Sequence, residues 1–141
     1  MRVFLDTNVL VAAFATRGLC ADVLRAVLVQ HEPVVADVVR DETARVLREK
    51  IGLDEARIDS VIGFLEPFRC DAAPDRSVPA VELRDPTDVV VVHAAIACKA
   101  DVVVTGDKDL LEARLPIVVR SPRAFWEALR GGAKADEVHE R

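Results

Sequence analysis

The stretch RVFLDTNVLVAAF, residues 2–14, places a single carboxylate between two apolar runs. Residues 3–5 are typical of a short buried strand, and the spacing of the apolar side chains predicts a helix over 8–15. Asp6 therefore stands where the strand ends. Sites in parallel sheets form beyond the carboxyl ends of the strands, so we expect Asp6 to face a crevice and not the core.

Short β-rich runs alternate with helical patterns along the rest of the chain. The valine run in 101–105 is typical of a parallel strand that is covered on both faces. The alternation predicts an α/β fold, a three-layer α/β/α domain with a central parallel sheet. Strands are expected at 3–5, 33–36, 69–72, 101–105 and 116–119, a loop at 77–86, and helices at 8–15, 19–30, 38–50, 54–64, 87–99 and 121–130. Asp37, Asp85 and Ser121 are the expected helix caps, and Gly52 the expected helix stop.

The chain of 141 residues, 51% of them apolar, is long enough for one domain with a real core. We expect that domain over residues 1–130, followed by a polar tail over 131–141 that is frayed or disordered. No apolar run is long enough to span a membrane, and the N-terminus lacks the pattern of a signal peptide. The expected location is the cytoplasm.

The three cysteines, Cys20, Cys70 and Cys98, are far apart and form no C-x-x-C pair. We therefore expect reduced thiols that pack as small core residues. The histidines make no zinc-binding spacing with them. The net charge of −5 argues against binding nucleic acid by phosphate neutralisation alone, so local basic groups or a bound metal would have to supply the affinity for a nucleic-acid substrate.

Further carboxylates stand at positions that can converge with Asp6. Asp107 follows the predicted strand 101–105 closely, and Asp109 comes two residues later. Asp88 begins the predicted helix 87–99, in line with apolar positions on its inner face, and Glu42 lies on a partly apolar face of the helix 38–50. We expect these side chains to meet in one crevice.

Carboxylates that share a crevice repel one another unless a cation neutralises them. Mg²⁺ and Mn²⁺ prefer carboxylate oxygens and water as ligands. A site of this kind suits hydrolysis of a phosphodiester bond, because such ions activate water and stabilise a leaving oxygen.

Four segments together resemble a PIN domain of the VapC-like toxin type, found in bacterial toxin–antitoxin pairs. They are FLDTNVLVAAF (4–14), ADVVRDETARVL (36–47), DPTDVVVVHAAIACKADVVVTGDKDLL (85–111) and SPRAFWEAL (121–129). The resemblance covers about residues 2–129. DTN alone is a weak signal, whereas four acids in the expected order and elements are a strong one.

The resemblance implies a metal-dependent ribonuclease that acts on RNA, forms a homodimer and is held inactive by an antitoxin protein. By the same resemblance, the metal-site acids are Asp6, Glu42, Asp88 and Asp107, with Asp109 as an auxiliary ligand and with Asn8 and Thr105 as polar supports. The cation would be Mg²⁺ or Mn²⁺. The sequence departs from the family pattern at Ala36-Asp37, where Ser-Pro is usual, and at His93, where a small apolar residue is usual.

Several of these acids have an ordinary structural interpretation as well. Asp6 and Asp109 can be helix caps, and Asp88 can act only on the dipole of its helix. Asp41 and Glu49 compete with Glu42 for the second acid position. The basic side chains around Glu42 are plausible phosphate contacts, although a solvated face explains them equally well.

Two other functions compete with the nuclease. One is a non-catalytic PIN-fold module that binds RNA or protein, which has no need of four acids. The other is a phospho-acceptor receiver domain, which requires a lysine at the end of a late strand. The predicted strand 116–119 is instead followed by Arg120 and Ser121, so this interpretation ranks low.

Overall fold

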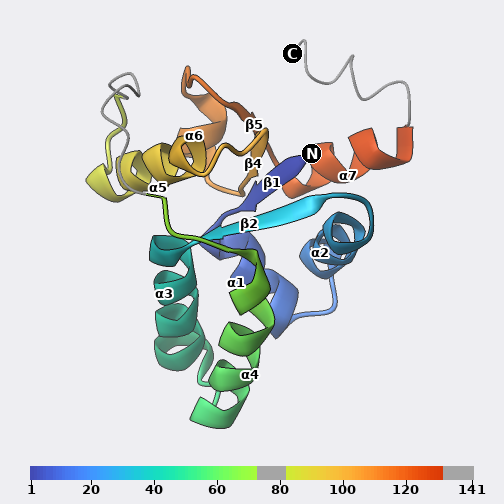
Figure 1. Ribbon diagram of the computed structural model, residues 1–141, viewed down its shortest axis with the longest axis vertical. Coiled ribbons are helices and arrows are strands. Elements are labelled where there is room, and N and C mark those ends of the chain that lie inside the picture. Colours follow the sequence, from blue (N-terminus) through green and yellow to red (C-terminus); the bar gives the residue numbers. More distant parts are fainter. Residues whose placement is uncertain (73–81, 132–141) are drawn as a thin grey trace.

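A computed structural model of the protein describes residues 1–72 and 82–131. Its centre is a five-stranded parallel sheet with the strand order β3-β2-β1-β4-β5 (Figure 1). The strands are β1 (Arg2–Leu5), β2 (Glu32–Ala36), β3 (Arg69–Cys70), β4 (Val102–Val104) and β5 (Val118–Arg120). All five expected strands are therefore present, within a few residues of their expected bounds.

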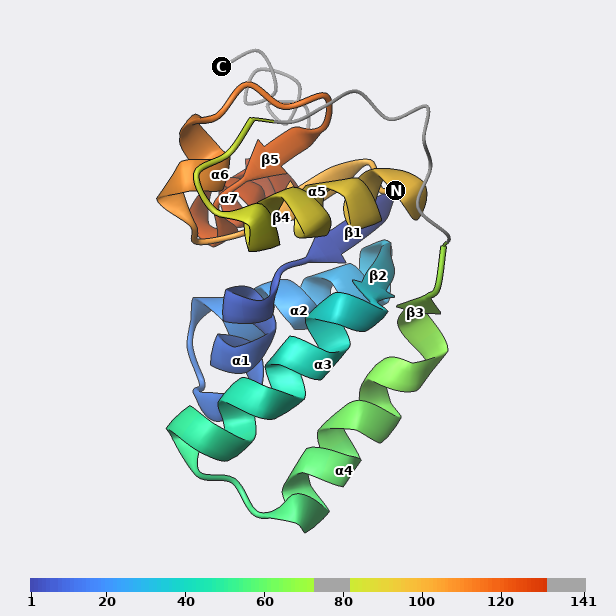
Figure 2. The same cartoon turned by 90° about the vertical axis from the view of Figure 1, so that its left-hand side faces the viewer.

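Helices cover both faces of this sheet. They are α1 (Thr7–Ala15), α2 (Leu19–Gln30), α3 (Asp37–Val46), α4 (Glu55–Leu65), α5 (Pro86–Ala97), α6 (Lys108–Glu112) and α7 (Pro122–Gly131). Helices α1 to α4 lie on one face and α5 and α6 on the other, while α7 packs against α2 (Figure 2). The expected three-layer α/β/α architecture is confirmed. Figure 2 also shows α3 and α4 extending away from the sheet as a pair.

The direction of the strand order reverses at the central strand. The chain moves from β1 to β2 on one side, and later returns to place β4 on the other side of β1. Val3 pairs with Val102 and Leu5 with Val104, so β1 and β4 end at the same level. In parallel sheets such a reversal opens a gap between the crossing helices. Asp6 and Thr105 are the first residues beyond the two strand ends.

The core consists mainly of valine and leucine side chains from the sheet and the helices that face it. The apolar side chains of β1 and β4 are almost completely buried, as the continuous apolar runs predict for strands covered on both faces. Phe4 and Leu10 are among the largest side chains that are fully buried. Phe125 of α7 is also buried, with 2% of its surface exposed.

Local sequence signals explain where most helices begin and end. The Asp54 side chain accepts from the Arg57 amide at the start of α4, and the Ser121 hydroxyl accepts from the Ala124 amide at the start of α7. Asp85 caps α5 as expected, with its carboxylate accepting from the Thr87 amide. Gly52 has a φ of +82°, the left-handed conformation in which glycine carries no steric penalty.

Three local details differ from expectation. Asp37 is the first residue of α3 and not its cap, because its carboxylate is engaged by Arg69. The predicted helix 38–50 passes into a π-helical turn over Leu47–Ile51. Helix α6 was not expected, since its five residues are too short for a periodic pattern. Residues 77–81 of the expected loop, and 132–141 of the expected tail, lie outside the described part of the chain.

The expectation of reduced thiols is wrong for two of the three cysteines. Cys70 and Cys98 form a disulfide with Cα atoms 6.0 Å apart, whereas Cys20 is free and half-buried. The pair is 28 residues apart in the chain, and only the packing of α5 beside the edge strand β3 brings the two together. A short-range motif could not reveal it.

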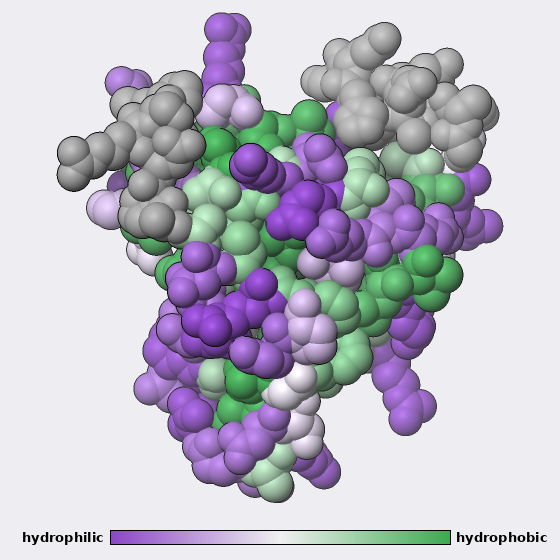
Figure 3. Space-filling view, in the orientation of Figure 1, coloured by the Kyte–Doolittle hydropathy of each residue, from purple (hydrophilic) through white to green (hydrophobic). Residues whose placement is uncertain are grey.

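Polar and apolar side chains alternate over the surface seen in Figure 3. Apolar residues gather over α5 in this view, above a hydrophilic group over the beginning of α3. Within residues 1–72 and 82–131, none of the helices is both long and apolar enough to cross a membrane.

Candidate metal centre

Asp6 lies at the carboxyl end of β1 and is 7% exposed. It is the N-cap of α1, and its Oδ1 accepts from the Thr7 amide at 2.8 Å. Its other oxygen, Oδ2, accepts from the hydroxyl of Thr105 at 2.8 Å and from the side-chain amide of Asn8 at 3.3 Å. Both carboxylate oxygens are thus held by protein donors, so the orientation of the group is determined before any ligand arrives.

The polar supports Asn8 and Thr105 form one continuous hydrogen-bond network across the carboxyl ends of β1 and β4. Asn8 accepts from the Gly106 amide at 2.8 Å, and Thr105 accepts from the Asp107 amide at 3.0 Å. The network therefore sets the position of Asp107 relative to Asp6. The contribution of the Gly106 amide was not predicted, because nothing in the sequence marks a backbone donor.

Three further carboxylates come together beside Asp6. One oxygen from each of Asp88, Asp107 and Asp109 lies within 4.8 Å of the other two. Asp88 lies in the first turn of α5, and Asp107 is the N-cap of α6, where it accepts from the Asp109 amide at 2.9 Å. Asp109 is inside the first turn of α6 and does not cap the helix, so its alternative role as a cap is wrong.

The acids perturb one another in the way that a shared crevice predicts. Burial, followed by the charges of Asp107, Asp85, Asp6 and Asp109, raises the pKa of Asp88 to about 6. Burial also raises the pKa of Asp6, with a smaller contribution from the charge of Asp107, while its hydrogen bonds oppose the rise. Both shifts have the sign expected when carboxylates approach one another without a counter-charge.

Glu42 is engaged by a basic side chain of its own helix. Its carboxylate is bound by Arg45, which donates from Nε at 3.1 Å and from Nη2 in a still shorter contact. That hydrogen bond is the main reason why the pKa of Glu42 is lowered. Arg45 also donates to Glu49 at 2.8 Å. The spacing of three and four residues is the sequence signal that could have revealed both pairs.

Two other basic side chains near Glu42, Arg40 and Arg48, also form ion pairs. Arg40 is paired with Asp37 and Asp41, and Arg48 with Glu55. These ion pairs leave fewer free cations for phosphate contacts than the sequence suggests, so the interpretation as a solvated charged face is the better one.

The geometry as a whole is suited to a hard divalent cation. Carboxylate oxygens of Asp88, Asp107 and Asp109 lie within 4.8 Å of one another. Burial, followed by neighbouring negative charges that include Asp6, raises the pKa of Asp88, and a bound cation would favour its ionised form. Of the expected site residues, Asp6, Asp88, Asp107, Asp109, Asn8 and Thr105 are brought together. Glu42 is not part of that group.

Comparison with known proteins gives a consistent result. A chain of the solved complex described as VapBC2 from Rickettsia felis, bound to a DNA fragment from their promoter, superposes with a TM-score of 0.65 at 20% identity. The match covers 86% of this chain and 98% of that chain, and it shows a shared fold. No curated protein matches the sequence significantly. The family model of the PIN domain matches residues 2–109, which is well over half of the chain, and this protein therefore belongs to the PIN domain family.

Proposed function

We propose that this protein is an endoribonuclease that hydrolyses RNA phosphodiester bonds with the help of Mg²⁺ or Mn²⁺. The observation that carries the proposal is the group formed by Asp88, Asp107 and Asp109 beside the oriented carboxylate of Asp6. Membership of the PIN domain family supports the same chemistry. A bound divalent cation would activate water for attack on phosphorus and stabilise the charge that develops on the phosphate.

The protein's own side chains have separate tasks in this proposal. Asp6, Asp88 and Asp107 hold the cation, and Asp109 is an auxiliary ligand. Thr105 and Asn8 keep the Asp6 carboxylate in one orientation through the hydrogen bonds described above. Glu42 is proposed as a fourth ligand that leaves Arg45 when the metal and RNA are bound, since four carboxylates are what the family resemblance assigns.

The test is cleavage of RNA by the purified protein with Mn²⁺, with Mg²⁺ and with EDTA. We expect cleavage only with a divalent cation and products with a 5′-phosphate, because water attacks phosphorus directly. Asp88→Asn should abolish the activity, and Asp59→Asn, which changes an exposed carboxylate on α4, should retain it. Activity in EDTA, or products with a 2′,3′-cyclic phosphate, would contradict the proposal. Binding of RNA without any cleavage would favour the non-catalytic PIN-fold module instead.

We also propose that the protein acts in the cytoplasm as the toxin of a toxin–antitoxin pair. The fold is shared with a chain of the VapBC2 complex, and the sequence resembles the VapC-like type. Expression of the wild-type chain alone should arrest the growth of a bacterial host, and Asp88→Asn should not. If the wild type is as harmless as Asp88→Asn although it cleaves RNA in vitro, the toxin assignment fails and the nuclease assignment survives.

A homodimer is the proposed assembly. The candidates for its contact surface are the aromatic side chains Phe64, Phe68, Phe125 and Trp126. Phe125 is buried in the core, so it is not available for such a contact. Phe64 is 43% exposed, with its ring 5.7 Å from that of Phe14 and 6.1 Å from that of Phe68. Sedimentation at tens of micromolar should show a dimer that Phe64→Ser weakens, and a wild-type monomer would contradict it.

A further inference from the structure

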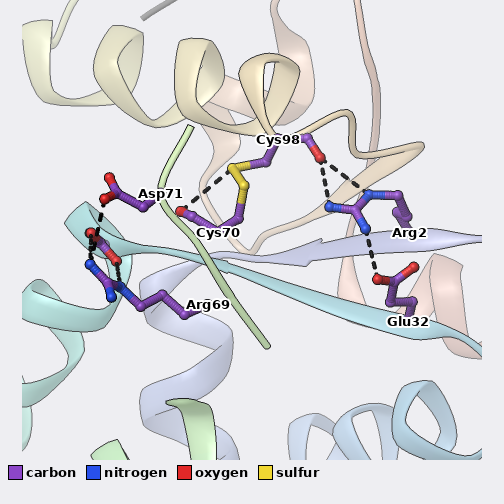
Figure 4. Close-up of a disulfide and its surroundings, with 7 residues drawn as sticks. Arg2, Glu32, Arg69, Cys70, Asp71 and Cys98 are labelled. Atoms are coloured by element: carbon purple, nitrogen blue, oxygen red, sulfur yellow. Dashed lines mark hydrogen bonds and ion pairs between the residues drawn. A yellow bond between two sulfur atoms is a disulfide. The ribbon is translucent and has the colours of Figure 1, made fainter. Parts of the chain in front are cut away.

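The disulfide between Cys70 and Cys98 ties the edge of the sheet to the helix that carries Asp88. Cys70 belongs to β3, and Cys98 is the residue that ends α5 (Figure 4). Asp88 lies in the first turn of the same helix. A helix is a stiff element, so a constraint on its last residue restricts the direction in which its first turn points.

Strand β3 is itself held to the helix that carries Glu42. Arg69 donates to both carboxylate oxygens of Asp37, at 2.7 and 3.0 Å, and Asp37 is the first residue of α3. Figure 4 shows Arg69 on one side of Cys70 and Cys98 on the other. The two residues of β3 therefore form a bracket between α3 and α5, the helices of Glu42 and Asp88.

The same end of α5 is also held by packing of Ala95 in the core and by polar contacts. Arg2 donates to the carbonyl oxygen of Cys98 from Nε at 3.2 Å and from Nη2 at 2.8 Å, and its Nη1 donates to Glu32 at 2.7 Å. These bonds are partly exposed, and each exchanges with bonds to water at little net cost. The disulfide is the covalent part of the attachment.

A cavity lies on the same side of α5. It has a volume of about 370 Å³ and is lined by Val90, His93, Ala94 and Ala97 of α5 together with both bonded cysteines. Among residues 1–72 and 82–131, none fills this space beside α5, so the disulfide is a major contact on that part of the helix. The cavity also gives a small thiol a path to the sulfur atoms.

We propose that Cys70 and Cys98 are positioning residues for the metal centre. Their disulfide holds α5 in the place that sets Asp88 against Asp107, and reduction of the disulfide releases α5 and weakens divalent-metal binding. The statement about metal rests on the proposed function, whereas the statement about the release of α5 does not.

The chemical step is reversible thiol–disulfide exchange with a dithiol reductant. One thiolate of the reductant attacks a sulfur of the Cys70–Cys98 bond, and the other cysteine leaves as a thiolate. The second thiolate of the reductant then displaces the first cysteine from the mixed disulfide. Two electrons pass to the protein, the two cysteines take up two protons, and the reductant becomes a disulfide. The cytoplasm keeps most thiols reduced, so a disulfide in a protein proposed to act there is expected to open and close.

The experiment compares four forms of the full chain: oxidised wild type, wild type reduced with dithiothreitol and freed from it under nitrogen, Cys98→Ser, and Cys20→Ser. Alkylation followed by mass spectrometry counts the free thiols in each form. Hydrogen exchange then reports the protection of the α5 amides, and calorimetry measures Mn²⁺ affinity at a temperature where every form is folded. Reoxidation of the reduced wild type provides the rescue.

We expect reduced wild type and Cys98→Ser to lose protection in α5 and to melt lower by roughly 10 °C. Their Mn²⁺ affinity should fall about tenfold, the effect typical of losing a group that orients a metal ligand. RNA cleavage should fall at limiting Mn²⁺ and recover at saturating Mn²⁺, which a purely global loss of stability does not produce. Cys20→Ser should match the oxidised wild type, and reoxidation should restore both protection and affinity.

Three results would overturn the proposal: free Cys70 and Cys98 thiols in protein purified without reductant, α5 protection that survives reduction, or α5 release with unchanged Mn²⁺ affinity. If no form binds Mn²⁺ although α5 is released on reduction, the proposed metal-dependent nuclease function fails. The statement that the disulfide holds α5 in place is then upheld. Metal binding and hydrogen exchange thus separate the two failures.

Discussion

The hydroxyl of Thr105 donates to the carboxylate of Asp6 across 2.8 Å, although the two residues are 99 positions apart in the chain. Both side chains are buried, and the same hydroxyl accepts from the Asp107 amide. One oxygen atom therefore connects two of the proposed metal ligands. Its removal is expected to affect stability and the site together.

Thr105→Val keeps the shape of the side chain and removes this hydroxyl. We expect the free energy of unfolding to fall by about 1–3 kcal/mol, because buried polar groups lose their partner. Urea denaturation in EDTA measures this loss, and calorimetry should show weaker Mn²⁺ binding. Thr43→Val is the matched control, since Thr43 is equally buried but donates only within α3, to the Val39 carbonyl. Unchanged Mn²⁺ affinity in Thr105→Val would contradict the supporting role of the hydroxyl.

Asp88→Asn and Asp6→Asn should have opposite effects on the metal-free protein. Burial, followed by the charges of neighbouring carboxylates, destabilises ionised Asp88, so the neutral amide should raise the free energy of unfolding by about 0.5–2 kcal/mol. Asp6 accepts from three donors, and an amide would turn an NH₂ group toward some of them, which should lower the free energy of unfolding by about 1–2 kcal/mol. Both variants should abolish the stabilisation of the protein by Mn²⁺.

Melting curves of the two variants and the wild type, in EDTA and in Mn²⁺, decide between these outcomes. Destabilisation by Asp88→Asn in EDTA would show that Asp88 is a structural partner and not part of a repelling group. A wild type that Mn²⁺ does not stabilise would remove the case for a metal centre.

The raised pKa of Asp88 predicts how stability depends on pH. Its folded-state pKa of about 6 lies above the ordinary value of 3.8, so between these values the folded protein binds more protons than the unfolded chain. The contribution of Asp88 to stability therefore falls as pH rises through that window. The advantage of Asp88→Asn over wild type in EDTA should be near zero at about pH 4 and reach its full size at about pH 7.

Metal binding should have the opposite pH dependence, because the cation requires the ionised carboxylate. Mn²⁺ affinity of the wild type should decline as pH falls below about 6. Denaturation and calorimetry across this range test both trends. An advantage of Asp88→Asn that is independent of pH would mean that the carboxyl titrates normally.

Glu42 and Glu49 offer a direct comparison, because both accept hydrogen bonds from Arg45. If Glu42 joins the metal centre with RNA bound, Glu42→Gln should reduce cleavage at least about tenfold. Glu49→Gln should retain activity, although it disturbs the same arginine. Equal effects of the two substitutions would assign Glu42 to the surface ion pairs alone.

Much of the fold could be predicted from residues whose local environment agrees with their position in the sheet. The uninterrupted valine run of β4 indicates a central parallel strand from composition alone. In the structure these valines are buried, as the run predicts. Gly52 and Asp85 mark helix ends through local backbone chemistry. Helix α6 was missed because it is held by the Asp107 cap and by burial of Leu110, and not by repeated periodicity.

The positions of the candidate site residues could be predicted where the ends of strands and helices determine them. The partners of long, exposed side chains could not be predicted as well. Asp6, Asp88 and Asp107 follow from the register of β1 and β4 and from the start of α5. The pairing of Glu42 with Arg45 depends on rotamers of exposed side chains, for which a helical pattern offers several partners. The Cys70–Cys98 pair depends on contact between an edge strand and a distant helix, which spacing does not reveal.

The central place of β1 in the sheet has a consequence for the order in which the protein becomes active during synthesis. β1 is synthesised before β4, yet the two strands pair, and Asp6 receives its hydrogen bond from Thr105. At about 5–20 residues per second, the ribosome needs several seconds to add the chain between them. A nascent chain that still lacks β4 therefore has no assembled carboxylate group, and the proposed nuclease would be inactive at that stage of synthesis.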